Sequence, residues 1–436
     1  MSPRGAWRWA ARVHAAWYLA ALAVAPLACA GEDERPPSIE PRDTRRSRPI
    51  AGCEEFEYRT CAITEASCQS EIFELMRCAY GVPEGTASIP PISLLTRAEA
   101  FELLSGSPED SGDLDPADFE ASMRARENLG LIEPGLVGSE SDSLELTLEG
   151  VAGLYLFASQ EIIVIDGGDS MADLAANTTL AHELVHALQD QVHDLGALSA
   201  SIEQTSDAAL AFASLVEGEA SVYELQMWVA YQGRGMDALD YDWLRDTGDD
   251  MSRESGSPAL TARLIFPYTY GTRYAVDLWL AGGGAALSAA YGAPPADTLE
   301  VVAGTTADRT PVDDMPAPLD GYSVLEEDVA GAWLMATTLA ELSGDQPTDL
   351  AVLAASWRGD RLVVYRESEG EGVVVDWTIH ARDDAAAQRI AAIYEGWRPP
   401  AGELALRADG STLHVVVSDA PSDAAEWLER WGSAAQ

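Results

Sequence analysis

The stretch from Leu180 to Asp190 contains two histidines four residues apart, and this spacing constrains the chain more than any other feature. On a helix of about 3.6 residues per turn, His182 and His186 lie on one face and can bind a single metal ion. Glu183 lies beside that ion, where a base for a water molecule is needed. Because the neighbouring residues are apolar or uncharged, the pattern favours metal-assisted hydrolysis over a pair of structural histidines.

A zinc hydrolase normally has three protein ligands and leaves a fourth position for water, so the two histidines need a partner. A histidine six residues after His186 would fall on Val192, and His193 comes one residue too late. His193 is therefore expected to be a surface or supporting histidine.

A better third ligand lies in a second apolar segment, about Asp207 to Tyr231, which is predicted to be a helix with Ser206 or Asp207 as its N-cap. A carboxylate buried there is costly without a partner. We favour Glu217, because Gly218 would let the backbone pack closely beside the first helix. Glu219 faces another side of the helix and is the alternative ligand. If neither glutamate binds a metal ion, both would be solvated residues on an exposed face of the helix.

Three segments in this order resemble the gluzincin metallopeptidases and, more closely, a group of exported bacterial metallopeptidases: His182–Gln191, Ser214–Ala220 and Phe266–Gly271. The segment Ser356–Arg361 also resembles a W-G-G-D-R-Y motif, with Arg358 in place of a glycine. The resemblance covers about residues 90–400. It does not define the substrate.

The resemblance implies a zincin-like fold and peptide-bond hydrolysis, with a peptide or protein as substrate. Zn²⁺ would be held by His182, His186 and Glu217. Glu183 would take a proton from water and return it to the leaving amine.

Three residues near Pro267 and Gly271 are candidates for stabilising the oxyanion: Tyr268, Tyr270 and Arg273. The proline and glycine should kink or interrupt a mostly helical segment over Ser257–Ala281. Core packing of the aromatic rings is the alternative for either tyrosine.

Two aspartates, Asp190 and Asp207, could orient the ligand histidines. A helix-surface role for Asp190 and an N-cap role for Asp207 are the simpler interpretations. By analogy with zincins, Glu161–Ile165 would lie near the edge strand on which a peptide can be laid.

The chain has 436 residues, of which 72 are acidic and 27 are basic, giving a net charge of −45. This balance argues against nucleic acid or an anionic membrane as a partner, because phosphate binding needs clustered Lys and Arg. The net charge does not indicate the oligomeric state.

Residues 1–30 have the layout of a secretory signal, with arginines before an apolar run from Ala15 to Ala28. Two processing routes fit the end of this run: cleavage after Ala30, or lipid attachment at Cys29, which would be the chain's contact with a membrane. Both make the protein exported, secreted or held in the bacterial cell envelope. Residues 31–52, rich in Pro, Arg and acidic residues, are predicted to be a disordered linker.

Residues 53–87 form a predicted cysteine-rich helical module with four cysteines. Two disulfides are expected in an oxidising compartment, with three connectivities open. If Tyr58–Thr64 and Ser67–Tyr80 form a helical hairpin, the nested pairs Cys53–Cys78 and Cys61–Cys68 are favoured. A four-thiolate zinc site is the alternative, without the usual C-x2-C spacing.

The fold class expected is α+β: a zincin-like catalytic domain over residues 88–345 and a small α/β module over 346–436. Helices are predicted at Ser93–Leu104, Asp118–Leu129, Leu174–Gln191, Glu326–Leu342 and Asp349–Trp357, and a hairpin over residues 153–166. The C-terminal strands at Arg361–Arg366, Gly372–His380, Glu403–Ala408 and Ser411–Ser418, with helices Asp383–Trp397 and Ser422–Trp431, suggest two strand-strand-helix units.

Two other functions remain open on the sequence alone. The first is a non-catalytic, zinc-containing envelope scaffold, although such structural sites normally close the fourth metal position. The second is a zinc hydrolase acting on a cell-wall amide.

Overall fold

The computed structural model describes residues 50–56, 59–105, 115–135, 144–145, 148, 151–165, 171, 173–238, 241–254, 258, 264–304, 308–312, 315–344, 349–419 and 424–433. The predicted signal, Cys29 and nearly all of the predicted linker lie outside these ranges. None of the described helices is long and apolar enough to cross a membrane.

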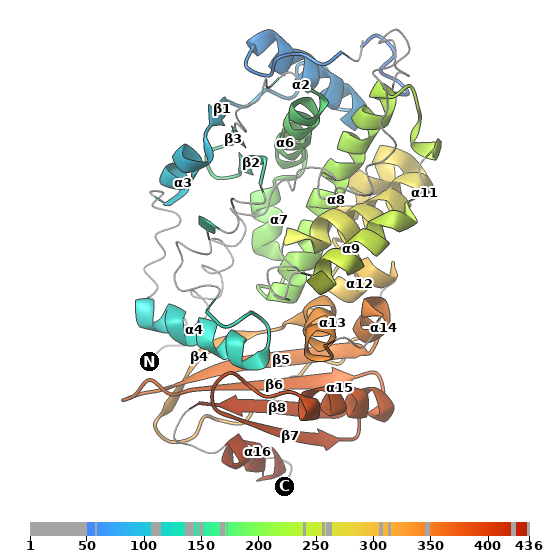
Figure 1. Cartoon of the computed structure of the whole chain (residues 1–436). Coiled ribbons are helices and arrows are strands. Elements are labelled where there is room, and N and C mark those ends of the chain that lie inside the picture. Colours follow the sequence, from blue (N-terminus) through green and yellow to red (C-terminus); the bar gives the residue numbers. More distant parts are fainter. Residues whose placement is uncertain are drawn as a thin grey trace.

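The chain has mixed α and β structure, as the sequence predicts, and its described residues form two parts. One part holds most of the long helices and a three-stranded sheet, and the other is built on a five-stranded sheet (Figure 1).

The N-terminal module consists of one helix, α2 (Ala66–Tyr80), and an extended segment before it. The disulfides are Cys53–Cys78 and Cys61–Cys68, which confirms the nested pairing. The helix expected over Tyr58–Thr64 is not formed in its described part, residues 59–64. There the backbone N–H of Cys61 donates to the side chain of Asn177 instead of to a helical turn.

The small sheet has the order β1-β3-β2, with β1 (Ile92–Leu95) parallel and β2 (Gly153–Leu156) antiparallel to β3 (Glu161–Ile165). The predicted hairpin is therefore present. β3 is the central strand, with the edge strands β1 and β2 on either side of it, so Glu161–Ile165 lies beside an edge strand and does not form one.

The helix predicted over Ser93–Leu104 begins later, as α3 (Arg97–Ser105), because residues 92–95 pair with β3. Thr96 and Glu99 form a reciprocal capping box at its start, which fixes where the helix begins.

The long helices pack around α8, which contacts α6, η3, α11, α12 and α13. Their bounds are α6 Leu174–His193, α7 Leu195–Ser201, α8 Ser206–Tyr231, η2 Met236–Ala238, α9 Asp242–Glu254, η3 Pro267–Gly271, α11 Thr272–Ala290 and α12 Thr298–Ala303.

Two helix starts in this part differ from expectation. Thr205, not Ser206 or Asp207, caps α8, since its side chain accepts from the backbone N–H of Ala208. The segment with Pro267 is a π-helical turn that leads into α11 rather than a simple kink. The rest of the helix predicted before it lies mainly outside the described residues.

The second part is an antiparallel sheet of order β4-β5-β6-β8-β7. Its strands are β4 Tyr322–Asp328, β5 Trp357–Glu367, β6 Val373–Ala381, β7 Glu403–Asp409 and β8 Thr412–Ser418. The helices of this part are α13 Gly331–Leu342, α14 Leu350–Ala354, α15 Asp384–Gly396 and α16 Ala424–Ser433. The two predicted strand-strand-helix units are present.

Side chains alternate across this sheet. Leu362 and Val364 of β5 pack in the core that contains α13 and α15, whereas Val363 and Tyr365 pack on the other face against Trp427 of α16. The helix expected over Glu326–Leu342 is wrong in its first part, because residues 322–328 pair with β5 as β4. The sheet thus takes a strand from before residue 346.

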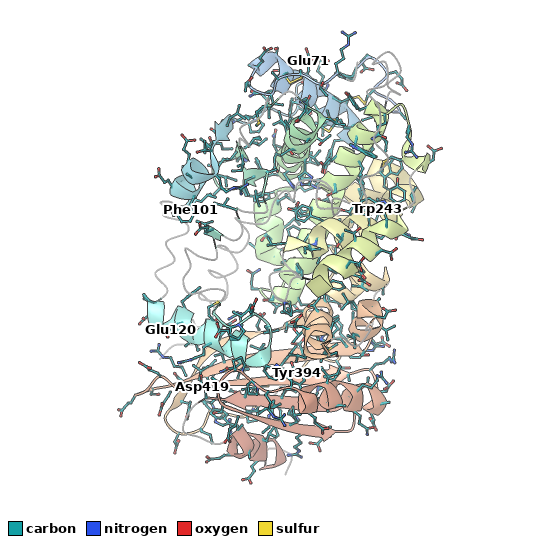
Figure 2. The ribbon with its side chains drawn as sticks, viewed as in Figure 1. Glu71, Phe101, Glu120, Trp243, Tyr394 and Asp419 are labelled. Atoms are coloured by element: carbon teal, nitrogen blue, oxygen red, sulfur yellow. A yellow bond between two sulfur atoms is a disulfide. The ribbon has the colours of Figure 1, made fainter. Side chains whose placement is uncertain are left out.

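Helix α4 (Pro116–Leu129) also packs on this sheet. Arg126 of α4 forms an ion pair with the buried Glu326 of β4 at 2.5 Å. Arg124 and Asn128 contact Asp419, which follows β8 and is labelled in Figure 2. A segment far earlier in the sequence therefore covers one face of the sheet (Figure 1).

Candidate metal centre

Helix α6 places His182, Glu183 and His186 in its buried middle part. Asp173 caps its first turn, and every residue from Asn177 to Gln189 is buried. The apolar residues predicted to flank the histidines pack in the core, among them Leu184 and Leu188. The two imidazole rings lie with their centroids 4.7 Å apart, as expected for a spacing of four on one helix face.

Helix α8 brings Glu217 to these histidines. Glu217 Oε2 lies 3.2 Å from His182 Nε2 and 3.4 Å from His186 Nε2. One ligand atom from each of the three residues lies within 4.8 Å of the others, and all three residues are buried. This group could hold a metal ion, and it contains the two histidines and the glutamate that the sequence favours.

Glu224 completes the surroundings of His182, and the sequence analysis missed it. Its Oε2 lies 3.2 Å from His182 Nδ1. Burial acts against a charged His182, but the bonds to Glu217 and Glu224 outweigh it and raise the pKa of His182 to about 10. Glu224 lies seven residues after Glu217, on the same face of α8, and a second buried carboxylate at this spacing is the signal that would have found it.

Glu183 is fully buried, and neither carboxylate oxygen makes a hydrogen bond of normal geometry with the described residues. Burial raises its pKa to about 8; the charge on His182 acts against the shift, and Glu217 and Glu224 add to it. Strand β2 lies against this carboxylate, since a Cβ atom on Gly153 would come within 2.8 Å of Glu183 Oε1. A side chain at that position of the strand would have to displace the Glu183 carboxylate.

Glu219, the alternative ligand, points away from the histidines. Its Oε2 accepts hydrogen bonds from Tyr291 Oη at 2.7 Å, Gln189 Nε2 at 3.0 Å and Tyr80 Oη at 3.1 Å. Burial raises its pKa to about 7, although these hydrogen bonds lower it in part. Glu219 is therefore a buried, hydrogen-bonded residue outside the ligand group.

Gly218 does permit a close backbone contact, but not with α6. A Cβ atom on Gly218 would lie 2.2 Å from the carbonyl oxygen of Gly271, at the end of η3. Gly218 was expected to bring α8 against α6, and this is wrong. The glycine brings α8 against η3, while Glu217 faces α6.

The three oxyanion candidates have different surroundings. The ring of Tyr268 stacks on His182, with centroids 6.1 Å apart. Tyr270 is buried against Phe266 and Trp333 and donates to Asp249 at 2.6 Å, which corresponds to the core-packing alternative.

Arg273 forms ion pairs with Asp277 at 3.1 Å and Asp242 at 3.5 Å. No contact found among the described residues links it to the ligand group. Of the three candidates, the structure therefore brings only Tyr268 beside a ligand histidine.

Asp190 and Asp207 do not contact the ligand histidines in the described structure. Asp190 accepts from Tyr155 Oη at 3.0 Å and so ties β2 to α6. Asp207 accepts from the hydroxyl and the backbone N–H of Thr298, far from the metal centre in the packing of α8 against α12. His193 stacks on Tyr291 with centroids 4.1 Å apart and is not part of the ligand group.

Comparisons of the chain with family models, curated proteins and solved structures found no match.

Proposed function

We propose that this chain is an exported, zinc-dependent metallopeptidase that hydrolyses peptide bonds. In this proposal His182, His186 and Glu217 hold the zinc ion, and Glu183 is the general base and acid. The observation that carries the proposal is the buried group of three possible ligands. Glu183, on the same helix as the two histidines, lies beside this group, and its carboxylate makes no hydrogen bond of normal geometry with the described residues.

The spacing of the ligand atoms supports zinc. Tetrahedral zinc with bonds of about 2.0–2.1 Å places neighbouring ligand atoms about 3.3 Å apart. The two distances from Glu217 Oε2 to the histidine nitrogens, 3.2 and 3.4 Å, agree with that geometry. Two histidines and one carboxylate are also the donor set of catalytic rather than structural zinc. A zinc ion held there would act as a Lewis acid towards water and a substrate carbonyl.

The protein groups around the ligands suit proton transfer. Glu183 has both oxygens available to accept a proton from the attacking water and to return it to the leaving nitrogen. Tyr268, stacked on His182, is the residue that we assign to the oxyanion. Glu224 keeps His182 oriented, in the manner of carboxylates that support metal-ligating histidines.

We also propose that the region around α6 and α8, within residues 88–345, has a zincin-like fold, supported by the strand β2 against α6 and by the ligand glutamate on a second helix. Helix α4 and strand β4 belong to the C-terminal sheet instead. The two disulfides are typical of an oxidising compartment and support export.

The proposal is tested with purified, metal-replete protein, by elemental analysis beside a protease assay on casein and a quenched peptide library. We expect one zinc ion per chain, lost in Glu217→Ala. Glu183→Gln should keep the zinc and lose about 10²–10⁴-fold in turnover, whereas the exposed Glu395→Gln should change neither. A wild-type protein without zinc, or a Glu183→Gln variant that still cleaves peptides, would contradict the proposal. Cell-wall fragments are tested as substrates in parallel, because cleavage of these fragments without cleavage of peptides would indicate a hydrolase of cell-wall amides.

A further inference from the structure

Gln189 connects the metal centre to the rest of α6 and α8. Its side-chain Oε1 lies 2.8 Å from His186 Nδ1. Its Nε2 donates to the carbonyl oxygen of Val216 at 2.8 Å and to Glu219 Oε2 at 3.0 Å. Gln189 is completely buried, so no solvent replaces these partners.

This arrangement fixes which ring nitrogen of His186 donates to Gln189. Both acceptors lie on the Nε2 side of the Gln189 amide, so a flipped amide would point its oxygen at two other oxygens. Oε1 must therefore face His186, whose Nδ1 donates to it. In the neutral ring, which is the form that binds a metal ion, the lone pair of His186 Nε2 is then on the side of Glu217.

Glu219 holds Gln189 in this orientation, and it is itself held by two phenols. Tyr291 and Tyr80 donate to the same Oε2 that accepts from Gln189. Three donors on one buried oxygen offset the cost of taking the carboxylate out of water. The hydrogen bonds from Tyr80 and Tyr291 thus hold Glu219 Oε2 in place as the acceptor for Gln189.

Tyr80 belongs to the disulfide-bearing module. It is the last residue of α2, two residues after Cys78, which is bonded to Cys53. Helix α2 packs on α6. A chain of three hydrogen bonds therefore runs from the module to the metal centre, through Tyr80, Glu219, Gln189 and His186.

We propose that Gln189 and Glu219 are positioning residues for His186, and that the disulfide-bearing helix α2 supports the metal centre through Tyr80. The inference rests on the proposed metal-binding function. It gives the N-terminal module a role in the site instead of a separate docking or inhibitory role.

The first test is zinc affinity, measured by competition with a chelator in folded, full-length protein. Gln189→Leu should weaken zinc binding by about 10–100-fold, the usual cost of losing a partner of a ligand histidine. Gln191→Leu is the matched control: Gln191 is exposed two residues along the same helix, bonds only to Ser88 among the contacts found in the described chain, and should leave affinity unchanged.

A spectroscopic readout separates positioning from general destabilisation. With Co²⁺ in place of zinc, Gln189→Leu should shift the visible absorption bands, because the geometry of His186 changes, while Gln191→Leu keeps the wild-type spectrum. If Gln189→Leu does not fold, the milder pair Tyr80→Phe and Tyr291→Phe replaces it, with a smaller loss of affinity expected. Wild-type affinity and spectrum in these variants would overturn the inference.

The role of α2 is tested by a double-mutant cycle between Tyr80→Phe and the paired change Cys53→Ser with Cys78→Ser. If the disulfide acts through Tyr80, the two losses of zinc affinity are not additive. Additive losses would remove α2 from the inference.

These outcomes also separate the inference from the proposed function. A wild-type protein that binds zinc, beside a Gln189→Leu variant that binds it equally tightly, would overturn the positioning role and leave the metallopeptidase proposal intact. Weaker zinc binding in Gln189→Leu, with no peptide hydrolysis by the wild type, would support the positioning role and overturn the metallopeptidase proposal. A wild-type protein that binds no zinc would overturn both.

Discussion

Gly218 and Gly271 bring two helices into backbone contact beside the metal centre. A Cβ atom on Gly218 would lie 2.2 Å from the carbonyl oxygen of Gly271, and one on Gly271 would lie 2.6 Å from that of Ser214. Glu217 precedes Gly218 on α8, and Tyr268 lies in the π-helical turn that ends at Gly271. The contact therefore sets the position of the tyrosine relative to the ligand. Single π-helical turns are frequent at functional sites.

Replacing Gly218 by alanine should push η3 away from α8. We expect Gly218→Ala to lower the free energy of unfolding by about 1–3 kcal/mol or more, as overpacking of a tight core does, and to weaken zinc binding. Urea unfolding and chelator competition measure the two effects. Gly396→Ala is the control, because a Cβ atom there meets nothing within 4 Å. Equal stability of the two variants would show that the contact is not tight.

Glu224 should contribute to metal affinity although it is not a ligand. Glu224→Gln keeps the size of the side chain but replaces the charged acceptor at His182 Nδ1. We expect a loss of about 10–100-fold in zinc affinity, with zinc still bound at saturation. The exposed Glu395→Gln is the matched control. If Glu224→Gln binds zinc as the wild type does, the bond to His182 has no role in holding the ion.

The buried group of His182, His186 and Glu217 was predictable because its signal is local. A spacing of four on one helix places His182 and His186 together, and a carboxylate in an apolar helix needs a charged partner. The C-terminal strands were equally clear, because apolar residues alternate along them, as Leu362 to Tyr365 show.

The parts that failed depend on residues far apart in the chain. Residues 322–328 end in Glu326, Glu327 and Asp328, which favours helix or loop locally. They form a strand because β5 is beside them and because Arg126, 200 residues earlier, pairs with Glu326. The role of Glu219 could not be predicted either, since Tyr80 and Tyr291, which bond to it, are 139 and 72 residues away.

The stability of the metal-free protein should depend on Glu183 in a defined pH range. Its pKa is raised from 4.5 to about 8, so the folded state favours the protonated form. The stability that this group contributes is fully present below about pH 4.5 and is lost as the pH rises to about 8. Glu183→Gln does not titrate. It should therefore become more stable than the wild type over this range, by an amount on the order of several kcal/mol for a fully buried group.

Urea unfolding at a series of pH values, with a chelator present, measures this difference. The two unfolding free energies should diverge between about pH 4.5 and 8 and run parallel above that range. Parallel curves throughout would mean that Glu183 is not desolvated in the folded protein. Stabilisation by a substitution that abolishes the proposed turnover would be the sign of a catalytic carboxylate held in an unfavourable place.

Tyr268 and Tyr270 offer the same substitution in two surroundings. Tyr270→Phe removes the hydrogen bond to Asp249, so we expect it to lower the free energy of unfolding by about 0.5–1.5 kcal/mol and to leave turnover of folded protein nearly unchanged. Tyr268→Phe keeps the ring that stacks on His182. If its hydroxyl stabilises the oxyanion, kcat should fall by about 10²–10³-fold, with zinc affinity retained.

Each variant is the control for the other, measured by unfolding, zinc affinity and peptide hydrolysis on the same preparations. The expected result is a crossed pattern: Tyr270→Phe loses stability and keeps activity, whereas Tyr268→Phe loses activity and keeps zinc. Full activity in Tyr268→Phe would assign the oxyanion to another group. Arg273 would not be the first choice, because its ion pairs with Asp277 and Asp242 direct the guanidinium towards neighbouring carboxylates.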